Sequence, residues 1–174
     1  FVRNIYATNQ GWYLSEVTRS QTKRTLRGLN HGVRLCEKDT WGWDYFGEVR
    51  PRDGDCEVFK HRYNAFIDTD LPLILRSKGI RTLIICGVTT NVCVESTTRH
   101  AYFLDYYCVV PDDAVAAYGD DLHEMALKNI DFLFGEVTGS DKIIETLAAN
   151  AKARTAGQAQ ASFTPTRSGR GGVG

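Results

Sequence analysis

The segment at residues 81–98, RTLIICGVTTNVCVESTT, constrains the fold of this chain more than any other. Residues 82–86 form a short apolar run that is rich in β-branched side chains, and Gly87 interrupts it. From Asn91 onward the residues suit a helix. We therefore predict a buried strand, a glycine turn, and a helix that carries Cys93 in its first turn.

This placement gives Cys93 a chemical context. Unpaired backbone N–H groups and the positive end of a helix dipole both favour a thiolate over a thiol. A cysteine held in this way can act as a nucleophile, and the neighbouring N–H groups can form an oxyanion hole. The alternative is a small buried hydrophobic residue, because free cysteines are commonly buried. The segment by itself leaves both interpretations open.

Motifs elsewhere in the chain carry a family resemblance. GVTTNVCVEST at residues 87–97 resembles the nucleophile motif of the isochorismatase-like cysteine hydrolases, and VFKHRYNAFIDTDL at 58–71 resembles the lysine segment of that family. IYATNQGW at 5–12 and TWGWDYFGEV at 40–49 extend the similarity. The combination is most similar to the ureidoacrylate amidohydrolase branch, over residues 4–147.

The order of the predicted elements and the family resemblance indicate the same fold. Predicted strands and helices alternate along the chain, which is typical of a three-layer α/β/α fold with a mostly parallel sheet. The resemblance implies the same architecture, the isochorismatase-like hydrolase fold. From the residues, we predict strands at 2–7, 56–60, 82–86, 106–110 and 136–138, and helices at 16–26, 70–78, 91–104, 121–134 and 140–149.

The resemblance also implies an activity. The family hydrolyses a C–N bond of a small linear amide or ureido (carbamoyl) compound, and the acyl group passes through a thioester on the cysteine. It implies a small-molecule substrate, a homo-oligomer and no cofactor, and the branch implies a place in pyrimidine catabolism.

Lys60 matches the catalytic lysine of the family. Its ammonium near the sulfur would favour the thiolate and stabilise a developing oxyanion. The alternative is an exposed lysine, which is the norm for this residue type. His61 follows where the family usually has proline, and it is either a surface histidine or a pocket residue.

The resemblance assigns a backbone feature and a pocket. Val88 and Thr89 match a non-proline cis peptide, which would direct the Thr89 N–H and the Cys93 N–H at the substrate carbonyl. An ordinary trans turn is the alternative. Four residues are assigned to substrate binding: Asn91, Tyr63, Asn64 and Phe66. Asn91 could instead cap the helix, and Phe66 could pack in the core. We expect Trp41 and Trp43 to be buried aromatic residues, and a pocket wall or an oligomer contact is the alternative.

The third catalytic residue of the family is an Asp at the end of its first strand. The first family-like segment here, residues 3–11, resembles the second strand. We therefore expect the first strand, the helix after it and the Asp to precede Phe1. The competing hypothesis is a non-catalytic paralogue, or a subunit that needs a partner to complete its sheet.

Composition excludes several classes of function. Lys and Arg together number 21, as do Asp and Glu, so no net charge favours nucleic acid or an anionic membrane. Five cysteines without a CxxC pair argue against a disulfide framework or zinc site and favour a reducing, cytoplasmic setting. No apolar run approaches the roughly 20 residues of a membrane span. NIYATNQGWY, at 4–13, lacks the Asp and His through which some relatives bind a metal, so we predict none.

The chain divides into two predicted regions. Residues 1–150 form the hydrolase domain, and residues 151–174 are rich in Ala, Gly, Ser, Thr and Arg. This second region has few large apolar residues, so we predict a disordered tail. We expect Cys86 and Cys108 in the core, because each lies in an apolar strand.

Overall fold

The computed structural model describes residues 1–5 and 36–161, while the predicted helix at 16–26 and the residues after 161 lie outside this part. The strands are β1 (Val2–Asn4), β2 (Val58–Lys60), β3 (Thr82–Ile84), β4 (Gly87–Val88), β5 (Tyr107–Pro111), β6 (Val115–Ala116) and β7 (Glu136–Thr138). The helices are η1 (Trp41–Trp43), α2 (Leu71–Ser77), η2 (Thr90–Val94), α3 (Glu95–Phe103), η3 (Asp112–Ala114), α4 (Asp120–Asn129), η4 (Ile130–Phe134) and α5 (Ser140–Ala161).

The strands form parallel ladders, as predicted for an α/β fold. β1 pairs with β2, β5 lies between β3 and β7, and β4 pairs with β6. Parallel neighbours need crossover connections, and helices α2 to α4 lie in the connections between strands. The ladders among the described strands are separate from one another, and all of them are parallel, as predicted for a mostly parallel sheet.

Local signals account for the helix boundaries. Asp70 is the N-cap residue of α2, and a proline lies in the first turn, where its missing N–H costs nothing. Gly79 follows the helix with φ of +63°, a conformation that suits glycine after a helix. The prediction of a helix from Asp70 to about Lys78 is therefore confirmed.

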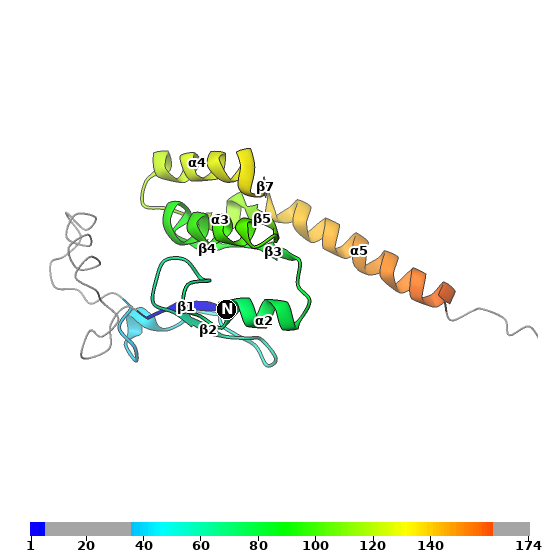
Figure 1. Cartoon of the computed structure of the whole chain (residues 1–174), viewed down its shortest axis with the longest axis horizontal. Helices are drawn as coiled ribbons and strands as arrows, with labels where there is room; N and C mark the ends of the chain where they lie inside the picture. Colours follow the sequence, from blue (N-terminus) through cyan, green and yellow to red (C-terminus); the bar gives the residue numbers. More distant parts are fainter. Residues whose placement is uncertain (6–35, 162–174) are drawn as a thin grey trace, which may run out of the picture.

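Two buried clusters form the core, and the continuous helical segment 90–103 contributes to both. Val94 packs with Val110, Val115 and Ile130, and Ala101 packs with Phe66 and Cys108. In Figure 1, α3 and α4 lie beside the β3–β5–β7 ladder, and Leu71 and Leu75 of α2 pack against the second cluster. The core thus fixes the helix that begins at the glycine turn.

Three predictions about single elements are wrong. Strand β3 ends at Ile84, so Cys86 lies outside the ladder and is exposed. Trp41 is 90 % exposed, because η1 lies at the surface. Helix α5 continues through Ala161, so residues 151–161 of the predicted tail are helical, consistent with the high helix propensity of alanine.

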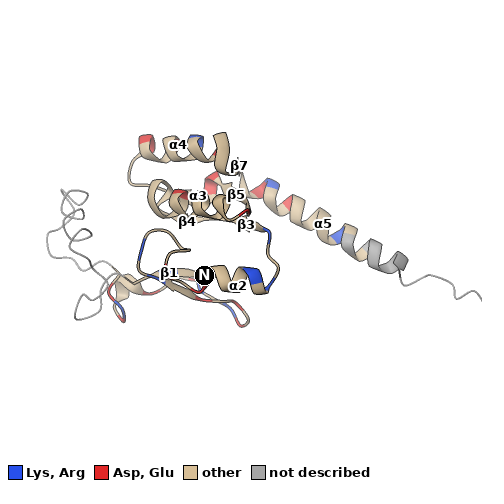
Figure 2. Cartoon of the chain, viewed as in Figure 1, with Lys and Arg blue, Asp and Glu red and all other residues tan. Residues whose placement is uncertain are grey.

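Charged residues of both signs are spread along the elements, as equal numbers of each lead one to expect (Figure 2). Of the described helices, none combines the length and the apolar character that crossing a bilayer requires.

Candidate active site

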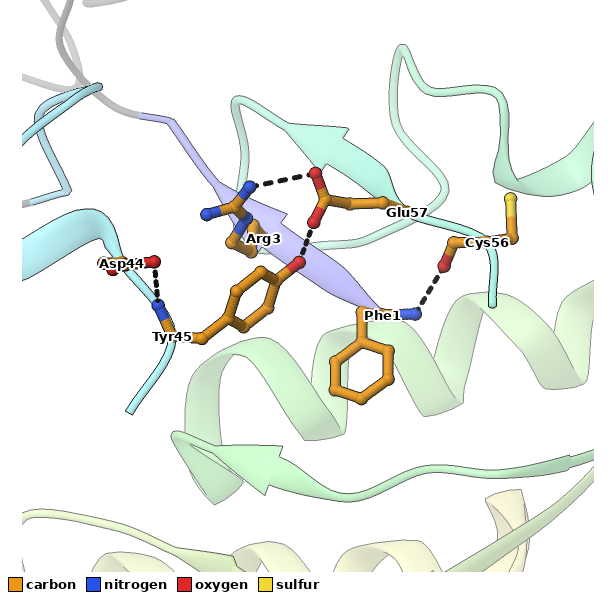
Figure 3. Close-up of polar contacts among 6 residues, drawn as sticks. All are labelled: Phe1, Arg3, Asp44, Tyr45, Cys56 and Glu57. Atoms are coloured by element: carbon orange, nitrogen blue, oxygen red, sulfur yellow. Dashed lines mark hydrogen bonds and ion pairs between the residues drawn. The ribbon is translucent and has the colours of Figure 1, made fainter. Parts of the chain in front are cut away.

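A network of polar contacts holds β1 against β2 (Figure 3). The backbone nitrogen of Phe1 donates to the Cys56 carbonyl at 2.7 Å, and the Arg3 guanidinium pairs with the Glu57 carboxylate at 2.9 Å. The Tyr45 hydroxyl donates to the other oxygen of Glu57. The register of the two strands then places Asn4 opposite Lys60.

Lys60 is the last residue of β2 and is only 6 % exposed. Its Nζ donates to the carbonyls of Arg62 at 2.9 Å and Tyr63 at 3.0 Å, and to the sulfur of Cys93 at 3.6 Å. A lysine ammonium has three N–H donors, and each has an acceptor here. The alternative of an exposed lysine is therefore wrong. The side chain is buried, and its ammonium group contacts the sulfur of Cys93.

The backbone that leads to Cys93 has the geometry that the resemblance implied. The peptide bond between Val88 and Thr89 is cis. Gly87, just before it, has φ of +114°, which side-chain-bearing residues rarely adopt. Thr89 is the N-cap of a π-helical turn, η2, that passes directly into α3 and carries Cys93.

The start of this helical segment presents backbone N–H groups. The first four N–H groups of a helix lack intrahelical partners, and the helix dipole places partial positive charge there. Cys93 is the fourth residue of the segment and is half-buried. Its sulfur therefore lies between a buried ammonium and the positive end of a helix.

A side chain from α4 reaches the same turn, which the sequence did not predict. Thr90 is fully buried, and its Oγ1 lies 3.0 Å from Nδ1 of His123. A single histidine in a predicted helix gives no signal of its partner, so the sequence offers no means of finding this contact.

The loop after Lys60 is docked on α3. Asn64 donates through Nδ2 to the Ser96 carbonyl at 3.1 Å, and the same atom lies 3.0 Å from Nδ1 of His100. The Ala65 N–H donates to the Thr97 hydroxyl at 3.1 Å. These bonds connect the lysine loop to the helix that carries Cys93, so they set the separation of the two.

The structure distributes the four predicted pocket residues differently. Phe66 is 5 % exposed and packs in the core, which is the alternative that the sequence left open. The Asn64 amide donates to the Ser96 carbonyl of α3, and Tyr63, beside Lys60, is 46 % exposed. Asn91 is half-buried inside η2, whose N-cap is Thr89, so Asn91 is not the cap.

The two tryptophans also differ from each other. Trp43 is half-buried, with the Arg3 guanidinium 3.9 Å above its ring and Phe59 stacked at 6.1 Å. It therefore packs on the β1–β2 ladder, whereas Trp41 is exposed. His61 is half-buried, and its Nδ1 lies 3.0 Å from the Ile5 carbonyl, so it also contacts this ladder.

Cys36 is a second cysteine within electrostatic range of the pair, and the sequence assigned it no role. Burial raises the pKa of the Cys36 thiol, the charge of Lys60 opposes this rise, and Cys93 adds to it. Cys108 is buried in the core as predicted, and burial raises its pKa to about 11. Neither environment resembles that of Cys93, which directly accepts a hydrogen bond from an ammonium.

A large surface cavity of about 1010 Å³ lies elsewhere, beside β5 and η4. Tyr107, Phe132 and Leu133 are among its lining residues, while Lys60 and Cys93 are not. We therefore locate the candidate active site at the lysine–cysteine pair rather than at this cavity.

Comparisons with known proteins identify the family of the chain. A family model described as the isochorismatase domain matches residues 9–142, so the chain belongs to the isochorismatase family. It is 39 % identical over 150 residues to the ureidoacrylate amidohydrolase RutB of Serratia proteamaculans (strain 568). That alignment covers 83 % of this chain and 58 % of the relative, so the chain spans less than two thirds of the relative's length.

Two solved structures extend the likeness to three dimensions. An isochorismatase-like hydrolase from Alkaliphilus metalliredigens superposes with a TM-score of 0.66 at 29 % identity, covering 84 % of this chain and 69 % of that one. N-carbamoylsarcosine amidase from Thermoplasma acidophilum gives a TM-score of 0.62 at 27 % identity, covering 80 % and 70 %. The α/β fold of the described residues is therefore the isochorismatase-like hydrolase fold.

Proposed function

We propose that the chain carries the nucleophile and the lysine of a cysteine-dependent amidohydrolase. The substrate class is a small linear amide or a ureido (carbamoyl) compound. The observation that carries the proposal is the 3.6 Å contact from Lys60 Nζ to Cys93 Sγ, at the start of a helix. A buried ammonium and a helix N-terminus together stabilise negative charge on the sulfur.

The chemistry follows from this geometry. The sulfur of Cys93 attacks the carbonyl carbon of the substrate and forms a C–S bond, while the carbonyl oxygen becomes an oxyanion. The N–H groups of Thr89 and Cys93 are our candidates for the oxyanion hole, and Lys60 supplies positive charge beside it. The C–N bond then breaks and the amine leaves with a proton. Water hydrolyses the thioester, which releases the acid and regenerates the thiol.

Proton transfer needs a general base, and the family resemblance implies an aspartate for that role. In the part of the chain that the structure describes, the Lys60 ammonium contacts two carbonyls and a sulfur rather than a carboxylate. We propose that an aspartate supplies this base, as the resemblance implies.

The names of two relatives support the substrate class. One is a ureidoacrylate amidohydrolase and another is an N-carbamoylsarcosine amidase, and both names describe cleavage of a C–N bond in a ureido or carbamoyl compound. Tyr63 and Asn91, beside Lys60 and Cys93, are the pocket residues that we retain for substrate contact. Cytoplasmic location, homo-oligomeric assembly and a role in pyrimidine catabolism are parts of the same proposal.

The test is turnover of a panel of ureido acids, carbamoyl amino acids and simple amides, with intact-mass detection of the acyl-enzyme. We expect a substrate-sized adduct on Cys93 that Cys93→Ala abolishes. Cys56→Ala should leave the adduct in place, because Cys56 is exposed and has no part in the proposed mechanism. An adduct that persists in Cys93→Ala, or turnover unaffected by it, would contradict the proposal.

A second candidate is a non-catalytic subunit completed by a partner. The observation that favours it is the separation of the β1–β2 and β3–β5–β7 ladders among the described strands. Intact mass of the native protein together with its size in solution distinguishes the two. A hetero-complex without Cys93-dependent hydrolysis would support the second candidate.

A further inference from the structure

Thr90 connects the helical segment that carries Cys93 to α4. It is the first residue of η2, and it directly follows the cis peptide at Val88–Thr89. It is 0 % exposed, and its hydroxyl lies 3.0 Å from Nδ1 of His123 in α4. Any movement of this threonine moves the backbone between the two proposed oxyanion-hole N–H groups.

Comparison with Thr98 shows why the histidine matters. Thr98 is also fully buried, but its hydroxyl donates to the Val94 carbonyl four residues earlier, within the same helical segment. Thr90 has no such option, because the residue four positions earlier, Cys86, lies before the helix begins. A buried hydroxyl without a partner costs free energy, so Thr90 depends on a side chain from another helix.

We propose that His123 is a positioning residue for the nucleophile. Through Thr90 it holds the first turn of η2, and with it the sulfur and N–H of Cys93, in place against Lys60. This inference rests on the proposed function, because it assigns a role within the same site. Among the described residues, the hydrogen bond of His123 is to Thr90 rather than to the sulfur or the lysine, so it acts through the threonine.

The geometry of the contact allows a selective test. The Nδ1 atom of histidine and the terminal polar atoms of asparagine are attached to the same side-chain carbon, Cγ. His123→Asn can therefore keep a polar atom near Thr90, whereas His123→Gln places its polar atoms one carbon further out. Glu124, next in α4, is exposed and pairs with Lys128 in the part of the chain that the structure describes, so Glu124→Gln is the matched control.

The first measurement is the rate of Cys93 alkylation by iodoacetamide, followed by peptide mass spectrometry. We expect roughly a 10-fold slower rate in His123→Gln, since small displacements of reacting groups have large effects on rate. His123→Asn should recover most of that loss, and Glu124→Gln should match the wild type. Thr90→Val should also slow alkylation, and adding His123→Gln to it should cause little further loss.

Two further readouts separate this inference from the proposed function. Hydrogen–deuterium exchange of the segment 88–95 should accelerate in His123→Gln and recover in His123→Asn, whether or not Cys93 proves reactive. With a turnover substrate, kcat should fall while KM stays near the wild-type value. Equal effects of the Asn and Gln variants on all of these, or no effect of either, would overturn the positioning role. Thermal unfolding of each variant identifies any that fails to fold. Thr90→Ser, which keeps the hydroxyl and the wild-type histidine, then tests the contact at the threonine.

Discussion

The two sides of the candidate site are held in opposite ways. On the lysine side, the ammonium of Lys60 binds carbonyls only two and three residues further along the chain. On the cysteine side, Val94 packs against residues of β5, β6 and η4, far apart in sequence. The lysine is thus fixed by a local loop, and the cysteine by the tertiary core.

The comparison shows where the geometry of the site is decided. Each side is well anchored within itself, so the 3.6 Å contact between Lys60 and Cys93 depends on how the lysine loop docks on α3. That junction consists of the Asn64 and Ala65 hydrogen bonds and of Phe66 in its apolar cluster. Substitutions there should separate the two sides without destroying either.

The largest effect should come from removing the lysine charge. In Lys60→Met the sulfur loses its ammonium, and we expect hydrolysis to fall roughly 100- to 1,000-fold, as when a group that stabilises an oxyanion is deleted. Two carbonyls also lose their donor, at about 1–3 kcal/mol for each that stays unsatisfied. Measured kcat/KM and urea unfolding check this. Lys142→Met, at an exposed lysine paired with Glu136, should change neither.

Truncation of Phe66 should break the apolar part of the junction. Phe66→Ala removes a ring buried against Ala101 and Cys108, and we expect a loss of about 3–5 kcal/mol in the free energy of unfolding. Phe66→Leu should lose much less and should retain turnover. A stable Phe66→Ala protein with raised KM would instead favour the substrate-binding role that the sequence assigned to this residue.

The polar part of the junction should have a smaller effect. Asn64→Ala removes the donor to the Ser96 carbonyl, and we expect it to cost about 1–3 kcal/mol of stability. Cys93 alkylation should slow as well, because the lysine loop is no longer tied to the nucleophile helix. Thr69→Ala, which breaks a bond inside the same loop, should leave the alkylation rate unchanged.

The smallest effect concerns pH. Burial raises the pKa of Cys108 to about 11 from an ordinary value of 9.0. The unfolded chain therefore loses this proton first, so stability should fall as pH rises from 9 toward 11. Unfolding curves of wild type and Cys108→Ala across this range test it, and the alanine variant should lack this component. Parallel curves would show that Cys108 does not contribute.

The structural features that the sequence predicted correctly are mostly local ones. The strand, glycine turn and helix around Cys93 lie where the pattern placed them, and the family motif predicted the cis peptide at Val88–Thr89 and the approach of Lys60. These features are encoded within short segments, where turn chemistry and periodicity act directly.

What the sequence missed depends on contacts between distant residues. The bond of His123 to Thr90 joins residues 33 positions apart, and no pattern in either helix indicates it. Cys86 was assigned to the core because its neighbours are apolar, but β3 stops at Ile84. For Phe66 the sequence leaves substrate binding and core packing open, and only the tertiary structure shows that it packs in the core.

The proposed function requires Lys60 and Cys93 to act as one unit. The most direct measurement is the alkylation rate of Cys93 relative to the exposed thiols of Cys56 and Cys86, in wild type and in Lys60→Met. We predict that Cys93 reacts fastest in the wild type, and that Lys60→Met slows Cys93 alone. If Cys93 reacts no faster than Cys56 and Cys86, or if its rate survives Lys60→Met, the claim is contradicted.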